Sequence, residues 1–247
     1  MPPGEQRGAV LSGPESDAGA AREGSAAKRP AASEPEQRRE QMLNAALEVL
    51  VERGYADTRI ADVAERTGTS PALVIYYFKT RDQLLTEAIR FSEDTWYAAG
   101  VRRMADIPAA AGRLTEIIAM SCLPQADPEP RSWWLLWLDL WALSPRNPGV
   151  AAVRRKFDER WREMIRSLVL AGQEAGEFTP VDADDFAVTL SSLLDGLAVQ
   201  IALDDADVSP RRAFELALGY AAGQLGFDPQ SAQKKQSAQK KTRKRGR

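Results

Sequence analysis

The chain has 247 residues, a formal net charge of −2, one cysteine and no histidine. Without histidine it lacks the commonest general base and metal ligand. A lone cysteine also excludes an internal disulfide, the usual zinc sites and the histidine-dependent catalytic triads. No run of about 18 uncharged apolar residues predicts a membrane span, and the N-terminus lacks the pattern of a secretory signal. We therefore expect a cytoplasmic protein that is not an enzyme and holds no metal or cofactor.

The two ends of the chain differ from the part between them. Residues 1–32 are rich in Gly, Pro, Ala, Ser and charge, which favours a disordered tail. Residues 229–247 form a second predicted tail, in which the segment 231–247 carries eight basic side chains and no acid. The rest of the chain then has a formal charge near −10. An acidic body is therefore followed by a basic, disordered end.

A first helix is predicted from Ser33. The segment Ser33-Glu34-Pro35-Glu36 has the form of a capping box with proline in the first turn, and Gly54 supplies a stop. The apolar positions between these points repeat at helical spacing. They form one face, made of Met42, Ala45, Ala46, Val49 and Leu50.

Residues 55–84 predict two short helices joined by a tight turn. Thr58 is the candidate N-cap of the first helix, and Gly68 can adopt the positive φ that the turn requires. Ser70 and Pro71 are suited to the N-cap and the first position of the second helix. A helix-turn-helix places its second helix in the major groove of DNA, so these residues predict a DNA-binding protein.

A fourth helix is predicted from a further capping box at Thr80 to about Gly100. Prolines and glycines separate the apolar segments that follow it. Five more helices are predicted, at Ala109–Cys122, Arg131–Leu143, Pro148–Gly176, Ala183–Leu203 and Pro210–Leu225. The fold is therefore expected to be all-α, with an N-terminal three-helix helix-turn-helix domain at 33–80 and a C-terminal helical domain at 81–228.

The segment GYADTRIADVAERTGTSPALVIYYFKTRDQLL carries a family resemblance. It is similar to the N-terminal pattern of the TetR family of bacterial regulators. The matching positions are Gly54, Tyr55, Thr58, Ile60, Ala61, Ala64, Gly68, Ser70, Tyr76, Phe78, Arg81 and Leu84. Thr69 and Arg81 depart mildly from it, since Val and Lys are common at those positions. The resemblance covers about residues 33–89.

The rest of the chain resembles, more loosely, the C-terminal half of the choline/betaine-responsive members of that family. The similar segments are RSWWLLWLDLWALSPRNP, FDERWREMI and LLDGLAVQIAL. The resemblance implies a ligand pocket inside the domain at 81–228 and a homodimer built from the last two helices. The apolar faces predicted for that dimer consist of Leu190, Leu193, Leu194, Leu197 and Ile201 on one helix and Phe214, Leu218 and Ala222 on the next.

The predicted partner of the N-terminal domain is a double-stranded DNA operator. Phosphate contacts supply affinity and base-edge contacts supply sequence choice. The candidate DNA-binding residues are Thr58, Ser70, Pro71, Ala72, Leu73, Tyr76, Tyr77, Lys79 and Arg81. Thr58 has the alternative role of a helix cap only, and Tyr77 that of a core side chain. The second helix lacks Arg, Gln and Asn, so sequence choice is expected to depend on apolar contact and DNA shape.

A small-molecule effector is the second predicted partner. The candidate effector-binding residues are Trp96, Trp134, Trp137, Asp139, Trp141 and Asp195. The three tryptophans from 134 to 141 follow i, i+3, i+7 spacing, and their stripe is either a packed core or the wall of an aromatic pocket. The two aspartates lie in apolar helices and need partners. Those partners are either Arg or backbone groups of the protein or a cationic ligand over tryptophan faces.

Three classes of function stay open at this point. The first is a dimeric repressor that a small molecule releases from a palindromic operator. The second is an effector-independent or architectural DNA-binding protein, which the basic tail favours. The third is an all-α enzyme, which the missing histidine disfavours. A well-formed pocket in the C-terminal domain would separate the first class from the second.

Overall fold

The computed structural model describes residues 33–123 and 130–229. The tails predicted at 1–32 and 229–247 lie outside these residues, apart from Pro229. From Glu34 onward the described residues belong to one compact unit. Its regular structure is helical and contains no strand within the described ranges, so the all-α prediction is confirmed.

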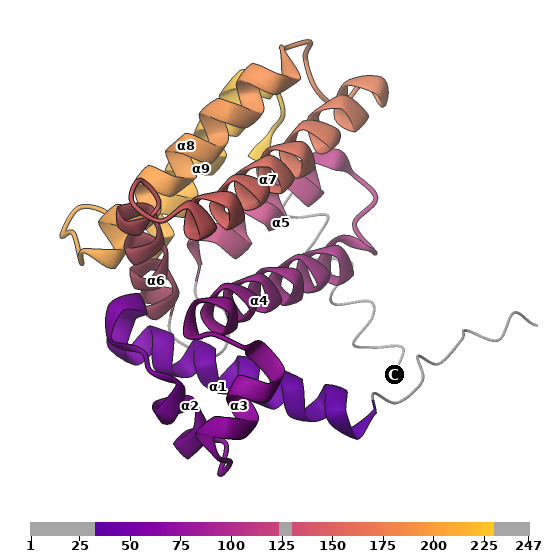
Figure 1. The fold of residues 1–247 in the computed structure, drawn as a ribbon. Helices are drawn as coiled ribbons and strands as arrows, with labels where there is room; N and C mark the ends of the chain where they lie inside the picture. Colours follow the sequence, from indigo (N-terminus) through magenta and orange to yellow (C-terminus); the bar gives the residue numbers. More distant parts are fainter. Residues whose placement is uncertain (1–32, 124–129, 230–247) are drawn as a thin grey trace, which may run out of the picture. The chain divides into compact units, whose positions relative to one another are not determined.

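The described helices follow the order that the sequence predicts. They are α1 (Glu34–Asp57), α2 (Ile60–Arg66), α3 (Pro71–Phe78), α4 (Arg81–Met104), α5 (Ala110–Cys122), α6 (Pro130–Leu143), α7 (Pro148–Glu174), α8 (Ala183–Ala202) and α9 (Pro210–Leu225). Helix α4 continues one turn beyond the predicted end. It packs against α1 on one side and against α5 and α7 on the other (Figure 1).

Side-chain caps explain why most helix starts were predictable. The Ser70 hydroxyl accepts a hydrogen bond from Leu73 N at 3.2 Å, and Ser209 caps α9 in the same way. The prediction for Thr58 is wrong by one residue, because Arg59 is the N-cap of α2. Thr58 is fully buried, and its Oγ1 donates instead to the carbonyl of Gly54 at 2.8 Å.

Gly54 interrupts α1 at the predicted place. Its φ of 76° and ψ of 170° are not helical, and an L side chain would be strained there. A Cβ atom at this position would lie 2.7 Å from Oδ2 of Asp139 in α6. Glycine is therefore favoured by the backbone conformation, and any side chain here would displace the Asp139 carboxylate.

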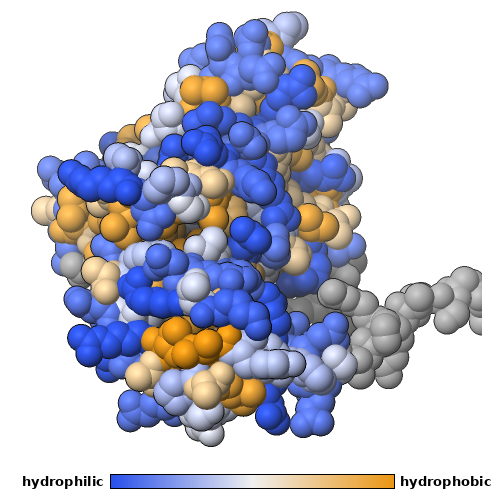
Figure 2. Space-filling model, viewed as in Figure 1, coloured by the Kyte–Doolittle hydropathy of each residue, from blue (hydrophilic) through white to orange (hydrophobic). Residues whose placement is uncertain are grey.

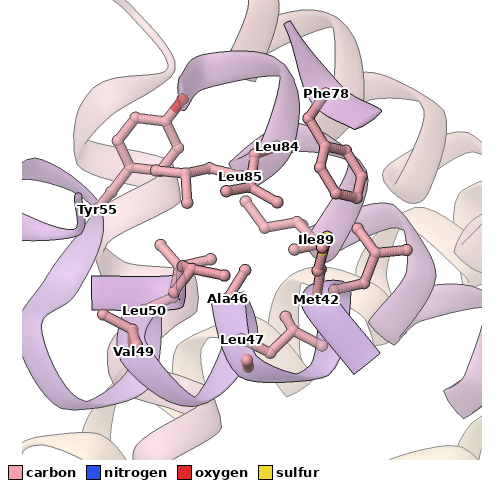
Figure 3. Packing of buried hydrophobic residues seen from close by; sticks show 14 of the residues in the cluster. Met42, Ala46, Leu47, Val49, Leu50, Tyr55, Phe78, Leu84, Leu85 and Ile89 are labelled. Carbon is pink, nitrogen blue, oxygen red and sulfur yellow. The ribbon is translucent and has the colours of Figure 1, made fainter. Parts of the chain in front are cut away.

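Two clusters of buried apolar side chains hold the helices together. The first joins α1–α4 to Leu136 and Leu140 of α6 and to the N-terminal part of α7, up to Phe157. Figure 3 shows part of it, with side chains of α1 facing those of α4. The second cluster joins α5, α8 and α9 to the C-terminal part of α7, which contributes Ile165 and Val169. Helix α7 is thus continuous through both clusters.

The residues predicted to form the dimer faces lie inside the chain's own core instead. Leu190, Leu194, Leu197, Ile201, Leu218 and Ala222 are buried, and Leu193 and Phe214 pack partly against the second cluster. The prediction is wrong in these residues because a helix with two apolar faces does not reveal which face packs internally. Among the described helices, α8 alone is long and apolar enough to cross a membrane, but half of its apolar window is buried by other helices.

Candidate DNA-binding surface and effector cavity

Helix α3 has one buried and one exposed face. Val74 and Phe78 are buried and anchor it to the first cluster. Ser70, Pro71, Ala72, Ile75 and Tyr76 are exposed, and the side chain of Tyr76 is 69% exposed. Figure 2 shows apolar side chains at the surface of the part of the molecule formed by α1 to α3. This face can meet base edges and thymine methyl groups in a major groove.

Two other predicted DNA-binding residues of α3 are only partly available. Leu73 and Tyr77 are half-buried and pack against the first cluster. The Tyr77 ring lies edge-on to Tyr76, with 5.6 Å between the ring centroids. Ile75 is 46% exposed and was not predicted, although its place one position before Tyr76 could have suggested it. Ile75 thus adds an apolar side chain to the exposed face of α3.

Lys79 ends α3 in an unusual conformation. Its φ is 62° and its ψ is −53°, and Thr80 N donates to the carbonyl of Phe78 at 2.7 Å. This i to i+2 hydrogen bond makes Lys79 the centre of a strained γ-turn. The Lys79 ammonium donates to the Tyr76 carbonyl at 2.8 Å and lies 5.2 Å from the centre of the Tyr76 ring. The exposed charge is therefore held beside the exposed face of α3.

Arg81 occupies a structural position, contrary to its prediction as a phosphate ligand. Its Nε donates to the Thr58 carbonyl at 2.6 Å, and Nη2 donates to the carbonyls of Tyr55 and Ala56. Arg81 therefore fixes the end of α1 and the loop between α1 and α2. The buried hydroxyl of Thr58 likewise cannot contact phosphate.

Other cations of this part of the chain differ in availability. Arg39 pairs with Glu87 and lies over the ring of Phe78, which gives it a packing role. Arg59 is exposed at the start of α2, and no carboxylate within the described residues pairs with its guanidinium. Arg59 and Lys79 are thus the best-placed cations beside α3 for the DNA backbone.

A cavity of about 390 Å³ lies between the two apolar clusters, and the residues lining it come from α1 and from α4 to α8. Among them are Trp96, Trp134, Trp137, Trp141 and Trp161. The rings meet mostly edge to face, with centroids 5.4 Å apart for Trp96 and Trp161 and 5.7 Å apart for Trp137 and Phe157. The tryptophan stripe of α6 therefore borders open space as well as packing against the core.

Asp139 does not line this cavity, which corrects its prediction as an effector-binding residue. Its Oδ2 accepts a hydrogen bond from Tyr55 N at 3.2 Å, directly after the Gly54 kink. The backbone partner that the sequence left open as an alternative is the one observed. Asp139 therefore links α6 to the segment that leads into the helix-turn-helix.

Three carboxylates line the cavity, and burial raises the pKa of each. The pKa of Glu93 is raised to about 7 by burial. Burial and the neighbouring charge of Asp158 raise the pKa of Asp195 to about 6, against the opposing effect of Arg162. Burial also raises the pKa of Asp158, although Arg154 pairs with it. Poorly solvated carboxylates beside indole rings suit a cationic guest.

Sequence reasoning missed several residues of this cavity. Glu93 lies in the polar run Ser92-Glu93-Asp94, which looks like a solvated helix surface. Asp158 and Arg162 belong to a strongly charged stretch of α7 and gave no signal of burial. Asn44 stands among the apolar positions of α1 and could have been noticed as an interruption.

An exposed second helix of a helix-turn-helix, joined to a helical bundle with an aromatic cavity, defines a DNA-binding transcription regulator. Comparison with known families agrees. Residues 42–88 match the family described as bacterial regulatory proteins, tetR family, and residues 108–226 match the C-terminal family of BetI-type transcriptional repressors. The chain belongs to the TetR family of bacterial transcription regulators, and its C-terminal part is of the BetI type.

Individual relatives are similar over most of their length. The transcriptional regulator BetI of Burkholderia thailandensis is 29% identical over 184 residues, covering 74% of this chain and 91% of the relative. A regulator of Saccharomonospora viridis, solved in complex with choline, superposes with a TM-score of 0.70 at 28% identity, covering 77% of this chain and 98% of that one. A TetR-family regulator of a Rhodococcus species has a TM-score of 0.68 at 27% identity, covering 77% and 99%. These relatives are named as transcription regulators and not as enzymes.

Proposed function

We propose that this regulator is a homodimeric repressor that leaves its operator when a small organic cation binds in the cavity. The observation that carries this proposal is the combination of five tryptophans with the carboxylates of Glu93, Asp158 and Asp195 in one cavity. Indole faces attract a cation through their quadrupole, and the attraction grows when water is excluded. The cavity volume lies in the usual range for small-molecule sites.

The choice of a quaternary or tertiary amine follows from the ring faces. Five indole rings line the cavity, and their faces attract a cation without any hydrogen bond. The three carboxylates supply the opposite charge. The related regulator of Saccharomonospora viridis, which was solved with choline, supports the same class.

The effector-responsive alternative is favoured over an architectural one because a cavity of this kind has no use in a purely structural DNA-binding protein. The DNA-binding residues of the proposal are Ser70, Pro71, Ala72, Ile75, Tyr76 and Lys79, with Arg59 as an additional phosphate ligand. Leu73 and Tyr77 support α3 from beneath. Because its operator is in the bacterial cytoplasm, we infer that location for the protein.

The experiment is a pair of titrations on the full-length protein. Choline, glycine betaine and the neutral carbon isostere of choline are titrated calorimetrically, and each is then added to the protein bound to a duplex that it selects from random DNA. We expect choline to bind and release the DNA, and the neutral isostere to bind at least tenfold more weakly because it lacks the charge.

Two results would contradict the proposal. Equal affinity for choline and its neutral isostere would show that the positive charge of the effector does not contribute to binding. Binding of choline with no change in DNA affinity would show that the cavity does not regulate DNA binding, since a ligand shifts an equilibrium only through different affinities for the two states of the protein.

A further inference from the structure

Helix α1 contributes part of the cavity wall, although it belongs to the DNA-binding part of the chain. Asn44 and Leu47 line the cavity from α1. The same helix continues to the Gly54 kink and from there into α2 and α3. A guest in the cavity would therefore touch the DNA-binding part directly, without an intervening layer of side chains.

The cavity also separates the two apolar clusters. Leu47, Phe157 and the flanking ring of Trp137 belong to the first cluster. Leu194 and the flanking rings of Trp134 and Trp161 belong to the second. A guest that fills this space contacts both clusters at once, so its binding free energy depends on their separation.

Asn44 is the polar side chain that α1 contributes to the cavity, and its carboxamide has unused hydrogen-bonding capacity. Its side chain is exposed, and it has no hydrogen-bond partner within residues 33–123 and 130–229. The carboxylates that suit a cation are on α4, α7 and α8, whereas α1 offers this amide. The NH2 group of a carboxamide can donate to a neutral or anionic oxygen, and its carbonyl oxygen can accept from a hydroxyl.

We propose that Asn44 binds the polar oxygen of the effector, so that the effector bridges α1 to α7 and α8. This rests on the proposed function, because it assigns one more residue to the same cavity. The contact is made or broken as α1 moves relative to the bundle. Effector affinity is therefore coupled to operator binding through Asn44, and thermodynamic linkage requires the coupling to act equally in both directions.

The test measures choline affinity with the protein free and bound to its selected duplex, for the wild type, Asn44→Ala and Gln41→Ala. Gln41 is an exposed amide on α1, one turn before Asn44, and does not line the cavity, so it is the matched control. We expect Asn44→Ala to weaken choline binding to the free protein about threefold to tenfold, the effect of one hydrogen bond.

The second readout is the ratio of choline affinities of the DNA-bound and free proteins. It distinguishes loss of the Asn44 contact from a general loss of protein stability. In the wild type and Gln41→Ala, choline should bind the DNA-bound protein more weakly than the free protein. In Asn44→Ala this ratio should move towards one, with DNA affinity and thermal midpoint unchanged in the absence of choline. If Asn44→Ala matches the wild type both in choline affinity and in the ratio of the free and DNA-bound affinities, the inference about Asn44 is wrong. The proposed function would not be affected by that result. Failure of the wild type to bind choline would overturn the proposed function and this inference with it.

Discussion

Tyr76 exposes most of an aromatic ring on the helix that is expected to enter the major groove. Truncating this side chain should change the free energy of unfolding of the free protein little, because no core atoms pack against most of the ring. On DNA we expect both the ring and the hydroxyl to gain partners. Lys79 lies beside the Tyr76 ring and places a positive charge at the same surface.

We therefore predict that Tyr76→Ala and Lys79→Ala each weaken operator binding by about 1–3 kcal/mol and leave the thermal midpoint nearly unchanged. Fluorescence anisotropy with the selected duplex measures the affinity. Tyr76→Phe is the control that separates the hydroxyl from the ring. Unchanged affinity in both alanine variants would show that α3 does not face the DNA.

Glu93 and Asp195 make the cavity sensitive to pH. Both carboxyls have raised pKa values, about 7 and about 6, because burial disfavours the ionised form. In the empty protein the folded state holds these protons at a pH where the unfolded chain has released them. The free energy of unfolding therefore falls as pH rises from about 4.5 to about 7, and the contribution of Glu93 is lost above that range.

A cationic effector favours the ionised carboxylates, so its binding should offset the stability that the empty protein loses when these groups ionise. We predict that choline binds about tenfold more tightly at pH 8 than at pH 6, as expected when a group with a pKa near 7 must lose its proton. Calorimetric titration at both values measures this. Glu93→Gln should bind choline more weakly at pH 8, flatten the pH dependence and raise the thermal midpoint of the empty protein at pH 8. A wild-type affinity independent of pH would exclude Glu93 from the site.

At the scale of elements, the last turn of α1 and the loop that leads to α2 are held from two sides. Asp139 of α6 accepts from Tyr55 N, and Arg81 at the start of α4 donates to the carbonyls of Tyr55, Ala56 and Thr58. Helix α2 begins two residues beyond Thr58. The position of the helix-turn-helix is thus set jointly by α4 and α6.

We predict that Asp139→Ala lowers the free energy of unfolding by about 1–3 kcal/mol, because Tyr55 N then loses its acceptor in a partly buried place. Urea denaturation measures this value. Asp139→Asn keeps an acceptor oxygen and should cost less than half as much. A negligible effect of Asp139→Ala would mean that water replaces the carboxylate at no cost.

The helix boundaries could be predicted because their signals are local. Ser70, Asn147 and Ser209 each cap a helix through a hydrogen bond to a residue two or three positions away. Asp139 was misassigned because its partner, Tyr55 N, lies 84 residues earlier in the chain. Arg81 was misassigned for the same reason, since the loop that it holds precedes it by more than 20 residues.

The cavity was predictable in kind but not in full composition. Five of the six residues proposed for it line one space, because a stripe of large rings cannot be covered completely by a small bundle. That they bind an effector stays a prediction. The partial burial of the Glu93 carboxyl could not be predicted, since it depends on α7 packing over a polar stretch of α4.

At the scale of the whole molecule, a few apolar side chains of α8 and α9 and of the residue after α8 stay exposed after these helices have packed. Val188 on α8, Leu203 directly after α8 and Leu216 on α9 are 45%, 64% and 39% exposed. A Cβ atom at Gly219 or Gly223 would meet nothing within 4 Å. These residues replace the buried leucines as the proposed surface between two copies of the chain.

We predict that the protein is a dimer at micromolar concentration and that Gly219→Arg with Gly223→Arg makes it monomeric. Both positions have open space in the single chain, so helix content should be unchanged. Light scattering after size-exclusion chromatography measures the mass. Val101→Arg, at an exposed position on α4, should leave the dimer intact. A wild-type monomer would refute the prediction.

The basic tail lies outside the described residues, and its prediction rests on charge alone. Its eight positive side chains should release counterions from DNA. Truncation after Pro229 should therefore reduce the slope of log K against log salt by up to about 0.9 for each phosphate that the tail neutralises. Sequence choice should not change. Equal slopes for the full-length and truncated proteins would identify the tail as a solubilising end without a DNA role.

The cavity between two separately packed clusters has a consequence for how the protein melts. The first cluster contains the DNA-binding helices, the second contains α5, α8 and α9, and α7 runs through both. Without a guest in the cavity, few apolar side chains of one cluster contact those of the other across it. The empty protein can then open in two stages, as cooperative units of different stability. A bound guest ties the two units into one, so the same molecule that changes DNA affinity would also make unfolding more nearly all-or-none.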